Sequence, residues 1–305
     1  HQHARTAIIL AVTAYALYSL GDAVLKYIGT ALPVGTIMTC GGGVIVVASL
    51  VALATRRQVD RLWTTPKLRL HVIRACIVGA IACLATNALR TVPLPDFYGI
   101  LFTSPFIIGV YAHFFMGEQI NMVRLCATIT GFIGVVILAG PHFDHMNIGY
   151  ILVFVQLFGV AAHVVTVRRI GAGDPWPLLT FYPGVGIFLV GLVQMIANPV
   201  WPGVAWIPLV IIYGFSIFLG QICFSRAYVT TPLLAIIAPY LYTQMLWGVL
   251  FGVYLFGQVP PATTWVGGGL IILGGILSLG YERHLRRLHL RSLRSGGVVG
   301  SGGHY

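Results

Sequence analysis

The sequence predicts an all-α integral membrane protein of ten transmembrane helices, arranged as two inverted five-helix repeats. Composition carries the first part of this prediction, because 58% of the 305 residues are hydrophobic, only 8% are charged, and the mean hydropathy is +0.90. A soluble globular domain carries about 25% charged residues, and a domain of this size cannot hide so much apolar surface from water. A spanning helix needs about 20 predominantly apolar residues, so the chain has room for about ten spans and little else.

The expected spans are separated by breaks that carry proline, glycine or charge, each of which ends one helix or begins the next. The spans cover residues 6–28, 34–54, 71–92, 96–116, 122–140, 148–168, 177–197, 206–227, 232–255 and 262–281. The breaks between them are, in order, Leu32-Pro33, Arg56-Arg57, Pro93-Leu94-Pro95, Gly117-Glu118, Gly140-Pro141, Gly173-Asp174-Pro175, Asn198-Pro199, Thr231-Pro232 and Pro260-Pro261.

The net charge of +11 is distributed unevenly over these spans. With ten spans, 16 of the 18 lysines and arginines fall on the side of the N-terminus, and only Lys26 and Arg90 fall toward the other side. Arg69 and Arg74 are both counted with the connection between the second and third spans, although Arg74 falls just inside the expected third span. Because Lys and Arg concentrate in cytoplasmic loops, we expect both termini in the cytoplasm and the chain in the cell inner membrane. The basic charge is then a topology signal, and no nucleic-acid partner is expected.

Three short motifs recur in register, which indicates an internal repeat. They pair Ala88–Leu94 with Ala227–Leu233, Gly117-Glu118 with Gly257-Gln258, and Gly134 with Gly274, at offsets of 139 or 140 residues. Since each copy has an odd number of spans, the second copy must enter the membrane in the opposite sense. We therefore predict a first repeat over 1–141, a second and inverted repeat over 142–282, and a basic, then Gly/Ser-rich cytoplasmic tail over 283–305.

These features resemble the EamA-type branch of the drug/metabolite transporter superfamily over about residues 6–282. The resemblance is carried by the Pro-Leu pairs that open the fourth and ninth spans, by Gly117-Glu118, and by the stretch from Asp22 to Lys26. Gln258 departs from the pattern, since the family often has Glu there.

The resemblance implies a secondary transporter that moves a small-molecule substrate across the lipid bilayer by alternating access. The first implied function is export of aromatic or neutral amino acids, as in YddG-type members. The alternative is an importer of a vitamin, a nucleobase or nucleoside, or S-adenosylmethionine on the same scaffold. The oligomeric state is left open, and a monomer is compatible with the resemblance.

The first span carries three polar residues on one helix face. Tyr18, Asp22 and Lys26 recur at intervals of four, so that Asp22 and Lys26 can pair as neighbours. Either Tyr18 and Asp22 lie on a substrate or proton path, or the ion pair fixes packing while Lys26 reaches the outer interface. Asp22 is the only Asp or Glu well inside an expected span, so a two-carboxylate enzyme has too few groups. The chain also lacks a Gly-rich Lys loop for ATP and a His-Glu-x-x-His motif, so we expect no enzyme activity, cofactor or metal.

An aromatic stripe with one polar member marks the ninth span. Its residues recur at alternating spacings of four and three and would form one helical face; they are Tyr240, Gln244, Trp247, Phe251 and Tyr254. Lipid-facing surfaces avoid a mid-span amide such as that of Gln244. We therefore expect Tyr240, Gln244 and Trp247 to line a substrate site that stacks on aromatic or apolar ligands. Tyr98 and Phe102 of the fourth span are expected to face this stripe from the other half.

Five further polar residues in or near the spans are candidates for transport. Asn87 and Arg90 lie on a stripe of small and polar residues in the third span, and Arg226 is the repeat mate of Asn87. Arg90 and Arg226 either steer a charged substrate group or anchor to lipid phosphates. His163 and Gln221 are single polar residues within the sixth and eighth spans, and each either packs through hydrogen bonds or binds substrate.

Overall fold

The computed structural model of the protein describes residues 2–29, 31–88, 91, 92, 97, 100–117, 122–139, 147–231, 237–257, 262, 265–274, 276 and 277. Its labelled α-helices are α1 (Gln2–Ile28), α2 (Val34–Thr55), α3 (Arg61–Thr64), α4 (Leu68–Ala88), α6 (Ser104–Met116), α7 (Met122–Ala139), α8 (Ile148–Ile170), α9 (Trp176–Ala197), α10 (Ile207–Thr230) and α12 (Thr243–Phe256). The described residues also form three 3-10 helices, η1 (Gly171–Gly173), η2 (Val204–Trp206) and η3 (Ala238–Tyr242). These described ranges contain no strand.

Among the described residues, six helices are long and apolar enough to cross a membrane by length and composition: α1, α2, α4, α8, α9 and α10. Shorter apolar helices occur at α6 and at Trp265–Gly274. Large apolar side chains lie on the outside of the bundle, for example Phe114, Val193 and Trp265, which are 76%, 70% and 73% exposed. Such a surface suits lipid rather than water. The predicted all-α membrane fold is confirmed, whereas the ten spans and the side of each terminus stay predictions.

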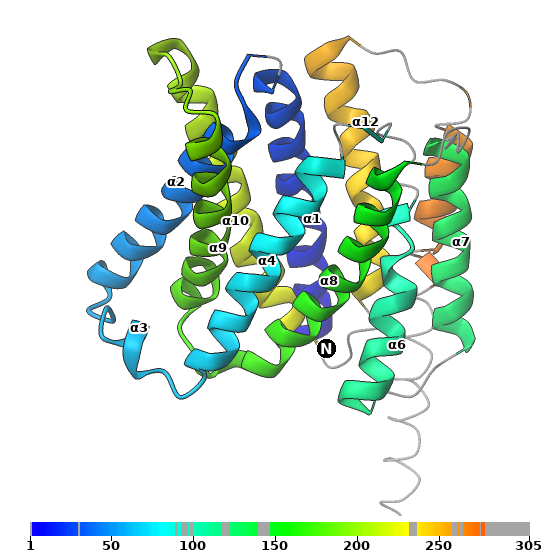
Figure 1. Cartoon of the computed structure of the whole chain (residues 1–305). Helices are drawn as coiled ribbons and strands as arrows, with labels where there is room; N and C mark the ends of the chain where they lie inside the picture. Colours follow the sequence, from blue (N-terminus) through cyan, green and yellow to red (C-terminus); the bar gives the residue numbers. More distant parts are fainter. Residues whose placement is uncertain are drawn as a thin grey trace, which may run out of the picture.

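The bundle is organised around α1 (Figure 1). Figure 1 shows α2, α9 and α10 toward one side of α1, and α6, α7 and α12 toward the other. α1 packs against α10 and α12, while α4 packs against α8 and α9 and α6 packs against α8. Helices from the two halves of the chain are therefore interleaved, and the interior surfaces are made by residues that lie far apart in the sequence.

Glycines bring α2 and α9 into close contact. A β-carbon added to Gly35 would lie 2.7 Å from the backbone nitrogen of Met195, and one added to Gly42 would lie 2.6 Å from that of Phe188. Small residues let membrane helices approach through their backbones. Because residue numbers rise along α2 while those of its contacts fall along α9, the two helices run antiparallel.

The expected fourth and ninth spans are both interrupted, which corrects the prediction of one continuous helix over 96–116 and over 232–255. Phe102 and Thr103 form a turn before α6 begins, and residues 238–242 form η3 before α12 begins. Each interruption coincides with a proline near the start of the following helical segment, Pro105 or Pro239, and proline cannot donate a backbone hydrogen bond. Since a 3-10 helix has 3.0 residues per turn, Tyr240 leaves the α-helical face that its spacing predicted.

The ends of α6 and α12 are built alike. Gly117 and Gly257 cap these helices in the left-handed conformation, with φ of 69° and 63°, and each N–H bonds to carbonyls one turn back. Glycine adopts this conformation without a steric penalty. The two glycines matched in the sequence thus have the same local structure, while the inverted sense of the repeats stays a prediction. Glu118, Gln258 and residues 283–305 lie outside the described residues.

Candidate transport site

A buried arginine lies at the centre of the candidate site. Arg74, in the second turn of α4, is 0% exposed. Its Nη1 donates to the carbonyl oxygen of Leu179 at 2.7 Å, and its Nη2 donates to Gln221 Oε1 at 3.2 Å and to Ser225 Oγ at 2.8 Å. The guanidinium therefore bridges α4, α9 and α10 through three acceptors, all of which are neutral.

The prediction that counted Arg74 with the loop before the third span is therefore wrong. Arg74 lies six residues after the start of α4, which corresponds to about 9 Å along the helix axis at 1.5 Å per residue. The nearby Arg69 is exposed, so the two basic residues look alike in the sequence but differ in environment. The signal that could have separated them is the apolar run on both sides of Arg74, together with the i, i+4 spacing of Gln221 and Ser225.

His163 of α8 lies beside this cluster, because its ring stacks on Phe224, the residue before Ser225 in α10. It is 7% exposed, and its ring stacks on Phe224 with centroids 5.1 Å apart and an interplanar angle of 19°. Among the described residues, His163 Nδ1 and Arg74 Nε have no hydrogen-bond partner. Buried polar atoms in native proteins are nearly always bonded, so these two atoms, like seven other side-chain atoms among the described residues, are open to a further partner.

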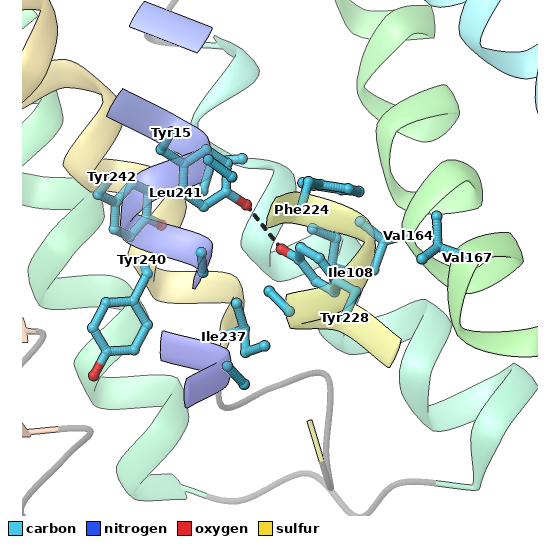
Figure 2. Packing of buried hydrophobic residues seen from close by; sticks show 14 of the residues in the cluster. Tyr15, Ile108, Val164, Val167, Phe224, Tyr228, Ile237, Tyr240, Leu241 and Tyr242 are labelled. Atoms are coloured by element: carbon cyan, nitrogen blue, oxygen red, sulfur yellow. Dashed lines mark hydrogen bonds between the residues drawn. The ribbon is translucent and has the colours of Figure 1, made fainter. Parts of the chain in front are cut away.

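Aromatic rings surround Phe224 between α1 and α10. The hydroxyl groups of Tyr15 and Tyr228 point toward each other and lie 2.9 Å apart (Figure 2). The Phe224 ring centroid is 4.5 Å from that of Tyr228 and 6.1 Å from that of Tyr18. The predicted residues Tyr18, His163 and Gln221 are thus brought to one region, next to an arginine and a phenylalanine that the sequence did not single out.

A second contact joins two other predicted residues. Gln244 Nε2 donates to Asp22 Oδ2 at 3.1 Å, and Ser19 Oγ donates to the carbonyl oxygen of Gln244 at 2.6 Å. These bonds tie α1 to α12, which belong to different predicted repeats. Asp22 is half-buried, as expected for a polar group that faces the interior of a membrane bundle.

The remaining candidates are more scattered. Phe102 is fully buried and packs edge-on against Tyr242, with centroids 6.1 Å apart. Tyr240 is buried, but its ring points away from the Tyr15–Tyr228 pair (Figure 2). Trp247 of α12 is half-buried.

Five of the predicted residues lie apart from the Arg74 cluster or outside the described residues. Asn87 donates to the carbonyl oxygen of Cys83 at 2.8 Å, one turn back in α4. The side chains of Lys26 and Arg226 are exposed, which agrees with the anchoring alternative. Arg90 and Tyr98 lie outside the described residues.

A polar cluster that the sequence did not predict lies where α4 and α9 begin. His71 Nε2 lies 3.0 Å from Asp174 Oδ2, and Thr65 Oγ1 donates to Asp174 Oδ1 at 2.9 Å. The Tyr182 ring stacks on His71 with centroids 4.9 Å apart. His71 is 0% exposed and the Asp174 side chain is 4% exposed. In the described part of the chain, no group of three or more His, Cys, Asp or Glu residues gathers that could hold a metal ion.

An apolar helical bundle that buries polar side chains between its membrane-crossing helices has the architecture of a multi-pass membrane protein. The chain is 26% identical over 272 residues to a riboflavin transporter of Vibrio cholerae, covering 86% of this chain and 89% of that protein. It is 23% identical over 266 residues to a riboflavin transporter of Brucella anthropi, covering 86% and 94%. It is 23% identical over 204 residues to an S-adenosylmethionine uptake transporter of Rickettsia conorii, covering 66% and 68%.

A solved crystal structure shares the fold, with a TM-score of 0.78 and 18% sequence identity, covering 92% of this chain and 99% of the other. No family model matches the chain. The protein is therefore a multi-pass membrane transporter, not an enzyme, and a distant homologue of riboflavin and S-adenosylmethionine uptake transporters.

Proposed function

We propose that the protein imports a riboflavin-type metabolite, a heteroaromatic ring with a polar side chain, across the cytoplasmic membrane. The observation that carries this proposal is the similarity to two riboflavin transporters over 86% of the chain. Similarity of that extent covers both halves of the bundle and the helices that hold the Arg74 cluster. Other relatives are S-adenosylmethionine uptake transporters, which also favours import over the amino-acid export expected first from the sequence.

The interior supports a planar aromatic ligand. Tyr18, Phe224, Tyr228 and His163 gather within ring-contact distances in one region. Aromatic rings prefer offset-stacked or edge-to-face neighbours, and ligand sites combine apolar walls with a few placed polar groups. In this proposal the Arg74 cluster and the Asp22–Gln244 contact supply those polar groups.

We further propose that residues 1–141 and 142–282 are inverted repeats that alternate access to the site. Two observations support this. Helices α2 and α9 hold equivalent places in the two halves and run antiparallel. The packing is also matched when α1, α2, α4 and α6 are compared in order with α8, α9, α10 and α12. α1 contacts α10 and α12, and its counterpart α8 contacts α4 and α6. Likewise, α2 contacts α10, and its counterpart α9 contacts α4. Such a pairing is expected for halves related by an axis in the membrane plane. In this proposal both termini and the tail over 283–305 lie in the cytoplasm, which the distribution of Lys and Arg favours.

The test is growth and uptake in a bacterial riboflavin auxotroph that lacks its own riboflavin transporter. Expression of the protein is expected to restore growth on low external riboflavin and to accelerate uptake of labelled riboflavin over the empty vector. Labelled S-adenosylmethionine and phenylalanine serve as comparison substrates. If riboflavin uptake stays at the vector level while the protein is present in the membrane, the proposed function is wrong.

A further inference from the structure

We propose that Arg74 and His163 form the polar end of the substrate site, which binds a carbonyl-rich or anionic edge of a planar ligand and rejects ligands with a fixed positive charge. The proposal rests on the proposed function and names the substrate group that the site recognises. It assigns to Arg74 a role that neither its place in the sequence nor the similarity to known transporters assigns.

The first argument is the charge of Arg74. A guanidinium stays protonated in proteins, and a buried charge without a counter-charge is costly in a membrane protein. Within the described part of the chain, no carboxylate contacts Arg74: Asp174 is bonded to His71 and Thr65, and Asp22 accepts from Gln244. The site therefore holds an excess positive charge that an electron-rich ligand would offset.

The second argument is the pair of unsatisfied atoms. Arg74 Nε and His163 Nδ1 come from α4 and α8, and both are buried without a partner among the described residues. A structural guanidinium in a packed interior would be expected to use all of its donors. A ligand that presents a carbonyl oxygen and a ring N–H or ring nitrogen would provide hydrogen-bond partners for both Arg74 Nε and His163 Nδ1.

The third argument is the shape of the surroundings. Phe224 stacks on His163, and the Tyr18 and Tyr228 rings lie at 6.1 and 4.5 Å from Phe224. In a conformation that is open at this point, a flat ligand would meet aromatic rings beside Arg74 and His163. The flavin ring of riboflavin has this combination, since one edge carries carbonyl oxygens and ring nitrogens. The sulfonium of S-adenosylmethionine would instead add a second positive charge to a site that already has one.

The experiment measures riboflavin binding and uptake by the purified full chain, with S-adenosylmethionine as competitor. The Arg74→Gln variant removes the charge and the guanidinium fork, and Arg69→Gln is the matched control because Arg69 is exposed on the same helix. Riboflavin affinity is expected to fall at least tenfold in Arg74→Gln and to stay unchanged in Arg69→Gln. A 100-fold excess of S-adenosylmethionine is expected to leave wild-type uptake unaffected and to inhibit the residual uptake of Arg74→Gln.

If Arg74 had only a structural role, Arg74→Gln would lower stability without changing the competition by S-adenosylmethionine. If Arg74→Gln fails to fold, His163→Phe is decisive, because it keeps a ring beside Phe224 and removes Nδ1; it is expected to lower riboflavin affinity at least fivefold. Wild-type affinity in folded Arg74→Gln or in His163→Phe would overturn the proposal, as would strong S-adenosylmethionine competition in the wild type. A wild-type protein that binds and moves neither compound would instead overturn the proposed function.

Discussion

Removing the Asp174 carboxylate is predicted to open the membrane face that carries α3. Asp174 accepts from Thr65 at 2.9 Å and pairs with His71 at 3.0 Å, and the His71 and Asp174 side chains are almost fully buried. Thr65 and His71 lie in the predicted first repeat and Asp174 lies in the second. These bonds therefore tie the two halves together at one end of the bundle, next to the Arg74 cluster.

The magnitude follows from the two bonds lost in Asp174→Ala. A hydrogen bond to a charged group contributes about 1.5–3 kcal/mol, so the closed arrangement of this face is weakened by about 3 kcal/mol. Since every 1.4 kcal/mol is a factor of about ten in an equilibrium constant, the population that is open at this face is expected to rise about 100-fold. Saturation would reduce the observed factor if the open form became the major one.

The assay is the alkylation rate of Cys223, retained as the single cysteine, by a small maleimide added to the face that carries α3. Cys223 is half-buried in α10, one residue from Phe224, so its reactivity reports access to the interior. The rate is expected to rise at least tenfold in Asp174→Ala. Asp60→Ala is the control, because Asp60 is exposed in the same connection. Equal rates in wild type and in folded Asp174→Ala would refute the view that this cluster holds the face closed.

Three further predictions concern packing and polar contacts. Gly42→Ala is expected to destabilise the protein by about 1–3 kcal/mol through overpacking, since its β-carbon would lie 2.6 Å from the backbone of Phe188. The control is Gly43→Ala, whose β-carbon would meet nothing closer than 3.8 Å and which should be neutral or stabilising. Unfolding experiments in detergent measure both variants. Tyr15→Phe or Tyr228→Phe alone should lower the free energy of unfolding by about 1–3 kcal/mol, because each leaves one buried hydroxyl unpaired. The double variant should lower it by less than the sum of the two single changes. Strict additivity would show that the 2.9 Å hydrogen bond does not form. Asp22→Ala removes an acceptor of Gln244 and is expected to slow uptake severalfold relative to Asp60→Ala; equal initial rates would remove Asp22 from the transport path.

Local sequence signals predicted the helices well where one apolar run lies between two breaks. The expected spans 34–54 and 177–197 correspond to α2 (Val34–Thr55) and α9 (Trp176–Ala197), because Pro33 and Pro175 fix the start of each helix. The interruptions before α6 and α12 were missed, since the apolar pattern continues through them. A proline in an apolar run is compatible with either a kinked helix or a restart, and tertiary packing decides between them.

The candidate site was predicted only in part, because it is assembled from residues far apart in the chain. Intramembrane polarity singled out Asp22, His163, Gln221 and Gln244, and the structure bonds Asp22 to Gln244 across two helices. Arg74 was missed because a basic residue close to a helix end is usually interfacial, and its acceptors lie 105 to 151 residues away. The role of a charged residue at a helix end can therefore be assigned only from its contacts in the three-dimensional structure.

The most direct test of the account is riboflavin flux into proteoliposomes that contain only the purified protein. The account predicts saturable entry of labelled riboflavin above empty liposomes, inhibited by excess unlabelled riboflavin and strongly reduced by Arg74→Gln. Flux equal to that of empty liposomes, from protein that is folded and inserted, would contradict the assignment of this chain as a riboflavin-type importer.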